Sequence, residues 1–186
     1  FACAAASRKA RTEALGSLSV SELWMGTIAT GECATAWLRD RGVAARCFLI
    51  DEDDGCFAAA GRTWGVMVHA GTGSWVLART PEGRQVRMGG MGPILGDDGS
   101  GWDLGLRGIR AALRSSWSAR TRTSLAEAVP PVLGVSRLHS IVGRPITTGQ
   151  ITRAQIAAVA PVVVREAAAG DGIALRALEQ AATSLA

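Results

Sequence analysis

The spacing of apolar residues changes along the chain, and the change separates predicted helices from predicted strands. Apolar residues recur at the period of an amphipathic helix in 31–42, 102–117, 151–171 and 172–186. Short runs of apolar and β-branched residues, typical of strands, lie in 43–50, 66–70, 75–80 and 84–88. The chain is therefore expected to be an α/β protein.

The first third of the chain is predicted to alternate helix and strand. A short helix is expected over 19–26 after a serine cap, and a second helix over 31–42. A strand over 43–50 follows, then an acidic turn, "DEDDG" at 51–55, and a short helix over 56–60. Ligands of α/β proteins gather at the carboxyl ends of strands, so the acidic turn occupies a functional position.

The rest of the chain is predicted to begin with an antiparallel meander of three strands and to continue as helices. A glycine-rich stretch at 89–105 leads into the next helix, and its backbone N–H groups suit an anionic or hydroxyl-rich ligand. The prolines of 118–150 indicate helix fragments and loops. Pro161 is expected to kink or restart the helix of 151–171, and Asp171 to cap the last helix.

The composition is that of a globular chain. Of its 186 residues 48% are hydrophobic, enough to bury a core, and polar residues and glycine interrupt every apolar run, so no segment is expected to span a membrane. The net charge of +4 is spread along the chain in arginines, and no dense basic block points to nucleic acid. Arg107, Arg110 and Arg114 are expected to form a solvated helix face.

The first residues and the cysteines are evidence on the cellular location of the protein. The opening "FACAAASRKA" lacks the order of a signal peptide and resembles a cut point. Cys3, Cys33, Cys47 and Cys56 form no C-x-x-C pair and have no histidine at metal-ligand spacing. We therefore expect reduced, buried thiols in a cytoplasmic protein, and no metal held by these cysteines.

Several common catalytic motifs are absent from the sequence. The single lysine, Lys9, is followed by alanine, which excludes a P-loop. "GTGSWV" carries valine where a dinucleotide-binding fingerprint needs its third glycine, and neither acidic loop supplies the glutamate of a calcium loop. Neither Ser74 nor Ser100 lies in G-x-S-x-G, and His69 is interpreted as a packed or hydrogen-bonded residue rather than a base. Serine hydrolase chemistry is therefore disfavoured.

Carboxylates in glycine-rich loops are the candidate chemistry that remains. Asp51, Asp53 and Asp54 follow one predicted strand, and Asp97 and Asp98 follow the meander. Phosphoryl transfer to a hydroxyl needs N–H groups around the phosphates, a metal, and a carboxylate that orients and deprotonates the acceptor. The residues leave two interpretations open. The carboxylates could form a phosphoryl-transfer centre, or they could lie in solvated Asp-Gly turns, and solvated turns are the more common case.

Three linked motifs resemble one known family. "AGTGS" at 70–74, "GGMG" at 89–92 and "GDDGSG" at 96–101 have the order and spacing of the N-acetylglucosamine kinase and BadF/BadG/BcrA/BcrD ATPase family, part of the actin, sugar-kinase and Hsp70 superfamily. The similarity extends over roughly 43–186. It implies a ribonuclease H-like, actin/hexokinase-type ATPase fold that is incomplete at both ends, since the terminal nucleotide-binding motifs of that superfamily are not found in this sequence.

The resemblance also implies a division into lobes and a set of site residues. It makes 1–64 the end of the N-terminal lobe and 65–186 the C-terminal lobe. It makes Asp54 the catalytic base for a sugar hydroxyl, and a one-residue shift would select Asp53 instead. The positions that it places beside the phosphate and the acceptor are Gly71, Thr72, Gly73 and Ser74. The positions to which it assigns sugar binding are Asp97, Gly99, Ser100 and Gly101.

An ATP-dependent phosphotransferase follows from this resemblance, with ATP and Mg²⁺ as cofactors and an amino sugar such as N-acetylglucosamine or glucosamine as substrate. Met91 replaces the family's usual tryptophan and Asp98 its glutamate, so the acceptor is less defined than the reaction. A homodimer is left open; neither nucleic acid nor a membrane is expected as a partner. Two alternatives remain. One is an ATPase activator of acyl-CoA dehydratases or reductases, but such an activator binds an iron–sulfur cluster through cysteines, and the residues around "GTGS" include none. The other is a truncated, non-catalytic member that binds a sugar.

Overall fold

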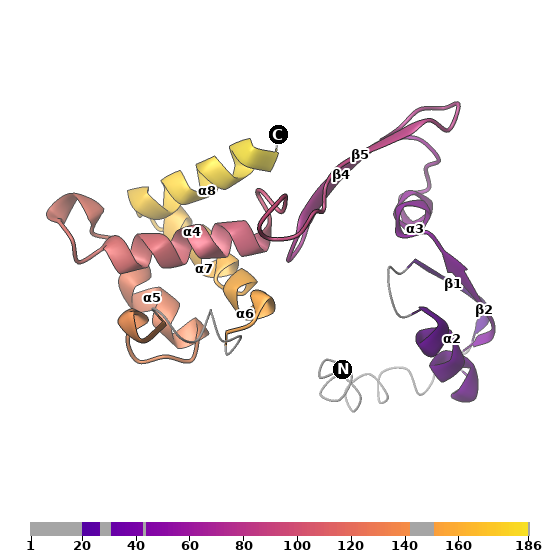
Figure 1. Cartoon of the computed structure of the whole chain (residues 1–186), viewed down its shortest axis with the longest axis horizontal. Coiled ribbons are helices and arrows are strands. Elements are labelled where there is room, and N and C mark those ends of the chain that lie inside the picture. Colours follow the sequence, from indigo (N-terminus) through magenta and orange to yellow (C-terminus); the bar gives the residue numbers. More distant parts are fainter. Residues whose placement is uncertain (1–19, 27–30, 43, 142–150, 186) are drawn as a thin grey trace. The chain divides into compact units, whose positions relative to one another are not determined.

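The computed structural model describes residues 20–26, 31–42, 44–141 and 151–185, and the chain divides into two compact units. The first unit comprises Phe1–Gly65 together with Arg79–Arg84, and the second comprises Val66–Ala78 together with Gln85–Ala186. Figure 1 labels the elements of both units. The assignment of 1–64 and 65–186 to two lobes stays a prediction.

The first unit contains a two-stranded parallel sheet with a helix in the crossover. Its elements are β1 (Val20–Gly26), α2 (Gly31–Asp40) and β2 (Ala44–Ile50). The helix expected over 19–26 is wrong, because this segment pairs along its length with β2, from Val20 opposite Ala44 to Gly26 opposite Ile50. Pairing with a parallel neighbour outweighs the helix signal of a serine at the start. Helix α2 and strand β2 confirm the other two expectations.

The acidic stretch after β2 begins a helix instead of forming a turn. Helix α3 spans Glu52–Ala59, and the Asp51 carboxylate caps it by accepting the N–H of Asp53 at 2.8 Å. Glu52, Asp53 and Asp54 therefore occupy the first helical turn, where the helix dipole favours negative charge. The predicted turn over 51–55 is wrong, because the four acidic residues serve as cap and first turn.

A three-stranded meander forms the second sheet. Its strands follow the chain in the order β3 (Gly65–Ala70), β4 (Ser74–Arg79) and β5 (Gln85–Gly89). The connections 71–73 and 80–84 are so short that neighbouring strands must run antiparallel, which confirms the predicted meander. In β4, Trp75 and Leu77 are buried.

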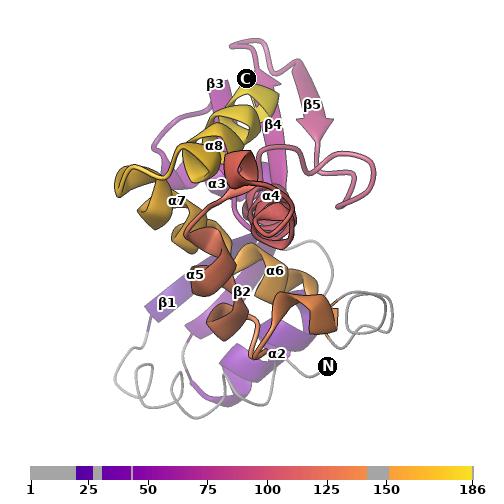
Figure 2. The same cartoon turned by 90° about the vertical axis from the view of Figure 1, so that its left-hand side faces the viewer.

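Helices make up the rest of the second unit. In its described part they are α4 (Gly101–Arg114), α5 (Leu125–Val132), α6 (Arg153–Ala157), α7 (Ala160–Ala168) and α8 (Gly172–Leu185), with 3₁₀ turns at Ala119–Thr121 and Leu138–Ile141. Helix α4 contacts α5, α6, α7 and α8, and so forms the centre of this layer (Figures 1 and 2). Ile109, Val129 and Val163 lie in the shared core. None of the described helices is long and apolar enough to cross a membrane.

The helix expected over 151–171 is two helices in the structure. Thr152 caps α6 by accepting the N–H of Gln155 at 3.2 Å. Pro161 lies in the first turn of α7, where its missing N–H leaves no hydrogen bond unmade, so the expected restart at this residue is confirmed. Asp171 caps α8 as predicted, because its carboxylate accepts the N–H groups of Ile173 and Ala174.

Candidate active site

The "GTGS" loop between β3 and β4 is held by the first turn of α4. Within the loop, the N–H of Gly71 donates to the carbonyl of Gly73 at 2.9 Å. From α4, Gly101 donates to the carbonyl of Gly71 at 2.8 Å and Trp102 to that of Thr72 at 3.3 Å. Segments that are separate motifs in the sequence therefore form one hydrogen-bonded unit, and the loop has a fixed shape.

Asp97 lies under the same loop and is almost completely buried, with 4% of its surface exposed. One carboxylate oxygen accepts the N–H of Ser74 at 3.2 Å, and the other is paired with the guanidinium of Arg153 at the start of α6. The hydroxyl of Ser74 in turn donates to the carbonyl of Asp98 at 2.5 Å. These contacts satisfy the charge of Asp97 without exposing it to solvent.

Packing explains why residue 73 is glycine. A Cβ at Gly73 would lie 2.6 Å from Nη2 of Arg153 and 2.6 Å from Oδ1 of Asp97. Any side chain at this position would therefore displace the ion pair or the loop. The glycine is required by the close approach of the two charged side chains, and its backbone φ is not in the left-handed region.

The turn that leads into α4 is fixed by its own side chains. Ser100, fully buried, caps the helix by accepting the N–H of Asp103 at 3.2 Å. The Asp103 carboxylate accepts the N–H of Gly99 at 3.0 Å and is paired with Arg107 at 3.0 Å. Gly99 has a φ of +70°, which only glycine adopts without strain. The structure thus gives the Ser100 hydroxyl a capping role, and its contact with a sugar stays a prediction.

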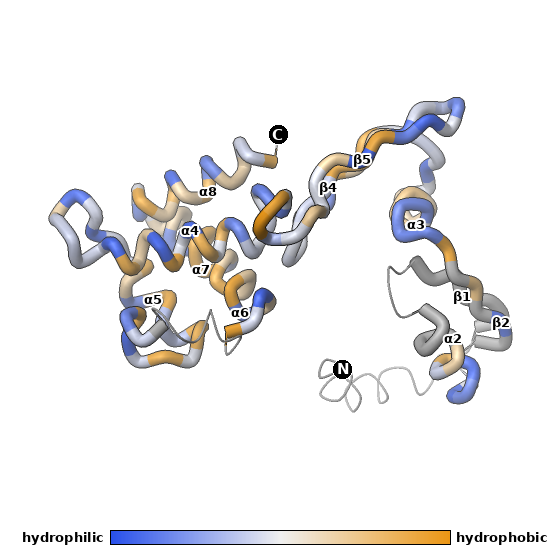
Figure 3. Tube along the Cα trace, in the orientation of Figure 1, coloured by the Kyte–Doolittle hydropathy of each residue, from blue (hydrophilic) through white to orange (hydrophobic). Residues whose placement is uncertain are grey.

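The "GGMG" turn also joins this assembly. The N–H of Gly90 donates to the carbonyls of Ser74 at 2.7 Å and Gly96 at 2.9 Å. Met91 is exposed, as are Ile94 and Leu95 after it. Figure 3 shows this apolar stretch of the loop between β5 and α4. The three motifs of the sequence are therefore brought together in the second unit.

Asp54 belongs to the first unit and has an accessible carboxylate. Its side chain is 58% exposed and accepts a hydrogen bond from Arg79 at 2.7 Å. The Arg79 guanidinium also lies over the ring of Phe57, 4.5 Å from its centre, which fixes the position of this arginine. Asp53 is 5% exposed. Of the two candidate bases, Asp54 is the one with an exposed side chain, and the choice between them stays a prediction.

Sequence reasoning missed Arg153, Asp103 and Arg79 as parts of these clusters. The "TRAQ" sequence at 152–155 is a capping box and could have placed Arg153 at the first position of a helix, but no local signal shows that it faces Asp97. His69 stacks on Trp75 with ring centres 5.2 Å apart, although its side chain is otherwise exposed. Among the residues described, no group of three or more His, Cys, Asp or Glu side chains could hold a metal ion.

Comparison with known proteins gives the family. Residues 33–186 match the BadF/BadG/BcrA/BcrD ATPase family. The chain belongs to this family. The resemblance read from the three motifs is therefore confirmed, and the match includes α3 with Asp54, the "GTGS" loop and the whole helical layer.

Curated relatives of this BadF-type chain are sugar kinases by name. The N-acetylmuramic acid/N-acetylglucosamine kinase of Clostridium acetobutylicum is 32% identical over 151 residues, which are 80% of this chain and 48% of that protein. The N-acetyl-D-glucosamine kinase of Dictyostelium discoideum is 30% identical over 125 residues, which are 67% of this chain and 39% of that protein. The chain thus spans about half, or less, of the length of these relatives.

Solved structures confirm the fold of this family member. A Chromobacterium violaceum protein provisionally assigned as an N-acetylglucosamine kinase superposes with a TM-score of 0.66 at 26% identity, over 94% of this chain and 62% of that one. A Porphyromonas gingivalis protein with the same provisional assignment superposes with a TM-score of 0.65 at 19% identity, over 97% of this chain and 64% of that one. The predicted actin/hexokinase-type ATPase fold is therefore confirmed.

Proposed function

We propose that the protein is an ATP-dependent kinase that transfers a phosphoryl group to a hydroxyl of N-acetylglucosamine or a closely related amino sugar. The observation that carries the proposal is the "GTGS" loop, fixed between buried Asp97 and the first turn of α4. The names of the curated relatives support the sugar substrate. With ATP as donor and Cys56 as a free thiol, we infer that this activity occurs in the cytoplasm.

Residues of the loop fit the phosphate groups of ATP. Among the described residues, the N–H groups of Thr72 and Gly73 have no protein acceptor, so both can donate to anionic oxygens, as backbone N–H groups of glycine-rich loops do. These groups would hold ATP, whose anhydride supplies the phosphoryl group to be transferred. Mg²⁺ would be held mainly by the ATP phosphates and would neutralise the charge that develops on them during the transfer.

Two carboxylates have different roles in the proposed reaction. Asp97, held by Ser74 and Arg153 and almost completely buried, keeps the loop in the shape that would hold the sugar. Asp54 accepts the proton of the attacking hydroxyl while the oxygen of that hydroxyl bonds to the γ-phosphorus and the bond from phosphorus to the ADP oxygen breaks. The exposure of the Asp54 side chain supports this assignment over Asp53.

Replacing each candidate base by its amide tests the proposal. In full-length protein, Asp54→Asn is expected to lower kcat for N-acetylglucosamine phosphorylation by about 100-fold or more, because the amide cannot accept the proton. Its affinity for the sugar, measured by calorimetry, should change little. Asp53→Asn is the matched control and should keep most of the turnover. Wild-type turnover in Asp54→Asn would remove Asp54 from the mechanism, and a loss confined to Asp53→Asn would move the role to Asp53.

A further inference from the structure

A hollow lies in the helical layer of the second unit, and none of the residues that line it belongs to the candidate active site. It has a volume of about 1030 Å³ and lies between the C-terminal end of α4, helix α5, the 3₁₀ turn at 138–141 and the start of α8. This volume is at the upper end of the range for small-molecule sites. The hollow is therefore large enough for a metabolite.

Basic side chains dominate the lining. Its charged residues are Arg120, Arg122, Arg137, Arg176, Glu127 and Asp171, and it also includes His139. Four guanidinium groups against two carboxylates leave a formal charge of +2 with the histidine neutral. No ion pair involving these four arginines occurs among the residues that the structure describes. Four guanidinium groups around one hollow, without an ion pair to any described residue, are a natural site for anions.

The carboxylate of Asp171 makes no ion pair with the arginines of the lining among the described residues, because its oxygens accept hydrogen bonds from other groups. One oxygen accepts hydrogen bonds from the hydroxyl of Thr123 at 2.7 Å and from the N–H and hydroxyl of Ser124 at 2.6 and 2.9 Å. The other accepts the N–H groups of Ile173 and Ala174. Asp171 therefore fixes the wall of the hollow, and the arginines remain available to a ligand.

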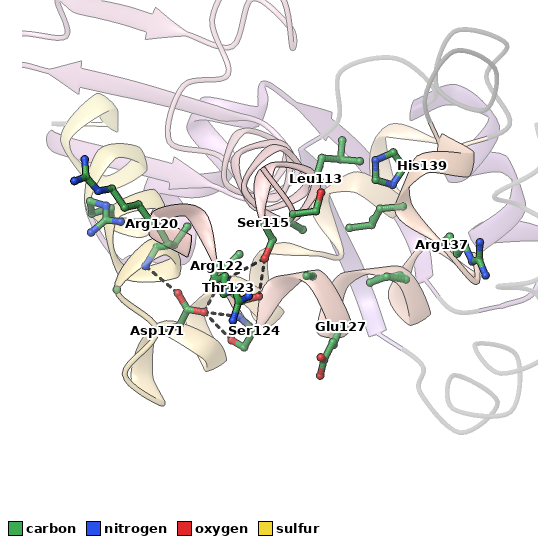
Figure 4. Close-up of a pocket in the computed structure, with 18 of the residues that line it drawn as sticks. Leu113, Ser115, Arg120, Arg122, Thr123, Ser124, Glu127, Arg137, His139 and Asp171 are labelled. Carbon is green, nitrogen blue, oxygen red and sulfur yellow. Dashed lines mark hydrogen bonds between the residues drawn. The ribbon is translucent and has the colours of Figure 1, made fainter. Parts of the chain in front are cut away.

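The basic groups are spread along the hollow. Figure 4 shows Arg120 at one end of the lining and Arg137 with His139 at the other, with Ser115, Thr123 and Ser124 between them. A ligand that meets both ends must be elongated and carry an anionic group at each end. Hydroxyl groups of the central residues would contact its middle.

We propose that this hollow binds an elongated small molecule with phosphate-type anionic groups at both ends, at a site separate from the candidate active site. The proposal does not rest on the sugar kinase activity, because none of its residues takes part in that reaction. The guanidinium groups are solvent-exposed, so the binding they provide is expected to weaken as salt concentration rises.

Hexane-1,6-bisphosphonate and hexylphosphonate test the proposal by calorimetry at low salt, since they differ only in the second anionic group. We expect the bisphosphonate to bind about tenfold more tightly, the effect of roughly one further charge-assisted hydrogen bond. Arg120→Gln and Arg137→Gln should each abolish most of this preference. Arg110→Gln, an exposed arginine of α4 outside the lining, should leave it unchanged, and thermal unfolding checks that all variants fold.

Asp97→Asn separates this site from the candidate active site, because it should leave bisphosphonate binding unchanged even where it impairs sugar phosphorylation. Equal affinity for the two probes, or equal effects of Arg110→Gln and Arg120→Gln, would overturn the proposal. So would displacement of the bisphosphonate by N-acetylglucosamine or ATP. Tight binding of an oligonucleotide with no binding of the bisphosphonate would replace the metabolite site by a nucleic-acid surface.

Discussion

Arg153 contributes to the candidate active site although it lies outside all three motifs. It follows Asp97 by 56 residues in the sequence, and its guanidinium pairs with that buried carboxylate. A buried carboxylate has lost most of its water and depends on the groups that replace it. Here those groups are the N–H of Ser74 and the guanidinium of Arg153. Removing Arg153 therefore removes one of the two groups that stabilise the buried carboxylate.

Replacing Arg153 by glutamine is expected to lower the free energy of unfolding by about 1–3 kcal/mol, because it leaves a buried carboxylate incompletely paired. Adding Asp97→Asn to the same chain should recover part of this loss, since the amide carries no charge and still accepts the N–H of Ser74. Urea unfolding measures the single and double variants. Arg110→Gln, at an exposed position on α4, is the control. If Arg110→Gln lowers the free energy of unfolding as much as Arg153→Gln does, Asp97 does not depend on Arg153.

At the scale of elements, local signals predicted those parts of the fold that local interactions determine. The restart at Pro161 and the cap at Asp171 depend on residues within one turn of the helix, and both were predicted. Strand β1 was missed because its conformation comes from pairing with β2, which lies beyond α2 in the sequence. The start of α3 was missed for another reason: Asp and Gly residues suit both a turn and a helix cap.

The crossing of α4 and α6 depends on a glycine that the periodic pattern does not single out. A Cβ at Gly105 would collide with the backbone carbonyl of Ile156, and a backbone atom cannot move aside as a flexible side chain can. Gly105→Ala is therefore expected to destabilise the protein by about 1–3 kcal/mol, despite the higher helix propensity of alanine. Gly172→Ala in α8 meets only Nη1 of Arg176 at 3.8 Å and serves as control in thermal unfolding. Equal unfolding temperatures for the two variants would contradict the predicted collision.

Asp171 joins the start of α5 to the start of α8, and its charge makes this junction sensitive to acid. Burial raises the pKa of its carboxyl, but hydrogen bonds from Thr123, Ala174 and Ser124 outweigh burial and hold the pKa well below its ordinary value of 3.8. A carboxyl group with a lowered pKa stabilises the folded state above its ordinary pKa, and this contribution is lost as the pH falls below it.

Asp171→Asn should therefore cost about 1–2 kcal/mol of unfolding free energy at neutral pH. Below about pH 4 the wild type should lose stability more steeply than the variant, so that the two curves approach each other. Urea unfolding at a series of pH values measures both curves. Glu179→Gln, an exposed carboxylate of α8, should follow the wild type. A constant difference between wild type and Asp171→Asn from neutral to acid pH would contradict the role of the charge.

At the scale of the whole molecule, the order and spacing of the three motifs predicted which loops of the candidate site come together, and no single motif did so. "GTGS" alone fits an ordinary hairpin turn, and only its spacing from "GGMG" and "GDDGSG" suggested one assembly, which the hydrogen bonds among Gly71, Ser74, Gly90 and Gly101 now show. The partners of the carboxylates could not be predicted in the same way. An ion pair such as that of Asp97 with Arg153 depends on how distant helices pack, and no local pattern encodes it.

The nucleophile that attacks ATP distinguishes a sugar kinase from an ATPase activator of the same family. In a kinase the sugar hydroxyl attacks, so ADP and sugar phosphate form together, whereas an activator hydrolyses ATP with water and carries an iron–sulfur cluster on cysteines. The residues of the "GTGS" neighbourhood include no cysteine, and Cys56 is a free thiol on α3.

We therefore expect ADP formation by the full-length protein to depend on added N-acetylglucosamine, with ADP and sugar phosphate in equal amounts, and no iron or sulfide in protein purified without oxygen. A coupled ADP assay, mass spectrometry of the sugar and metal analysis measure these quantities. Galactose is a suitable control acceptor, because it lacks the acetamido group and should not stimulate ADP formation. ADP formation at the same rate without any sugar, together with bound iron and sulfide, would identify the protein as an ATPase activator, because water would then accept the phosphoryl group.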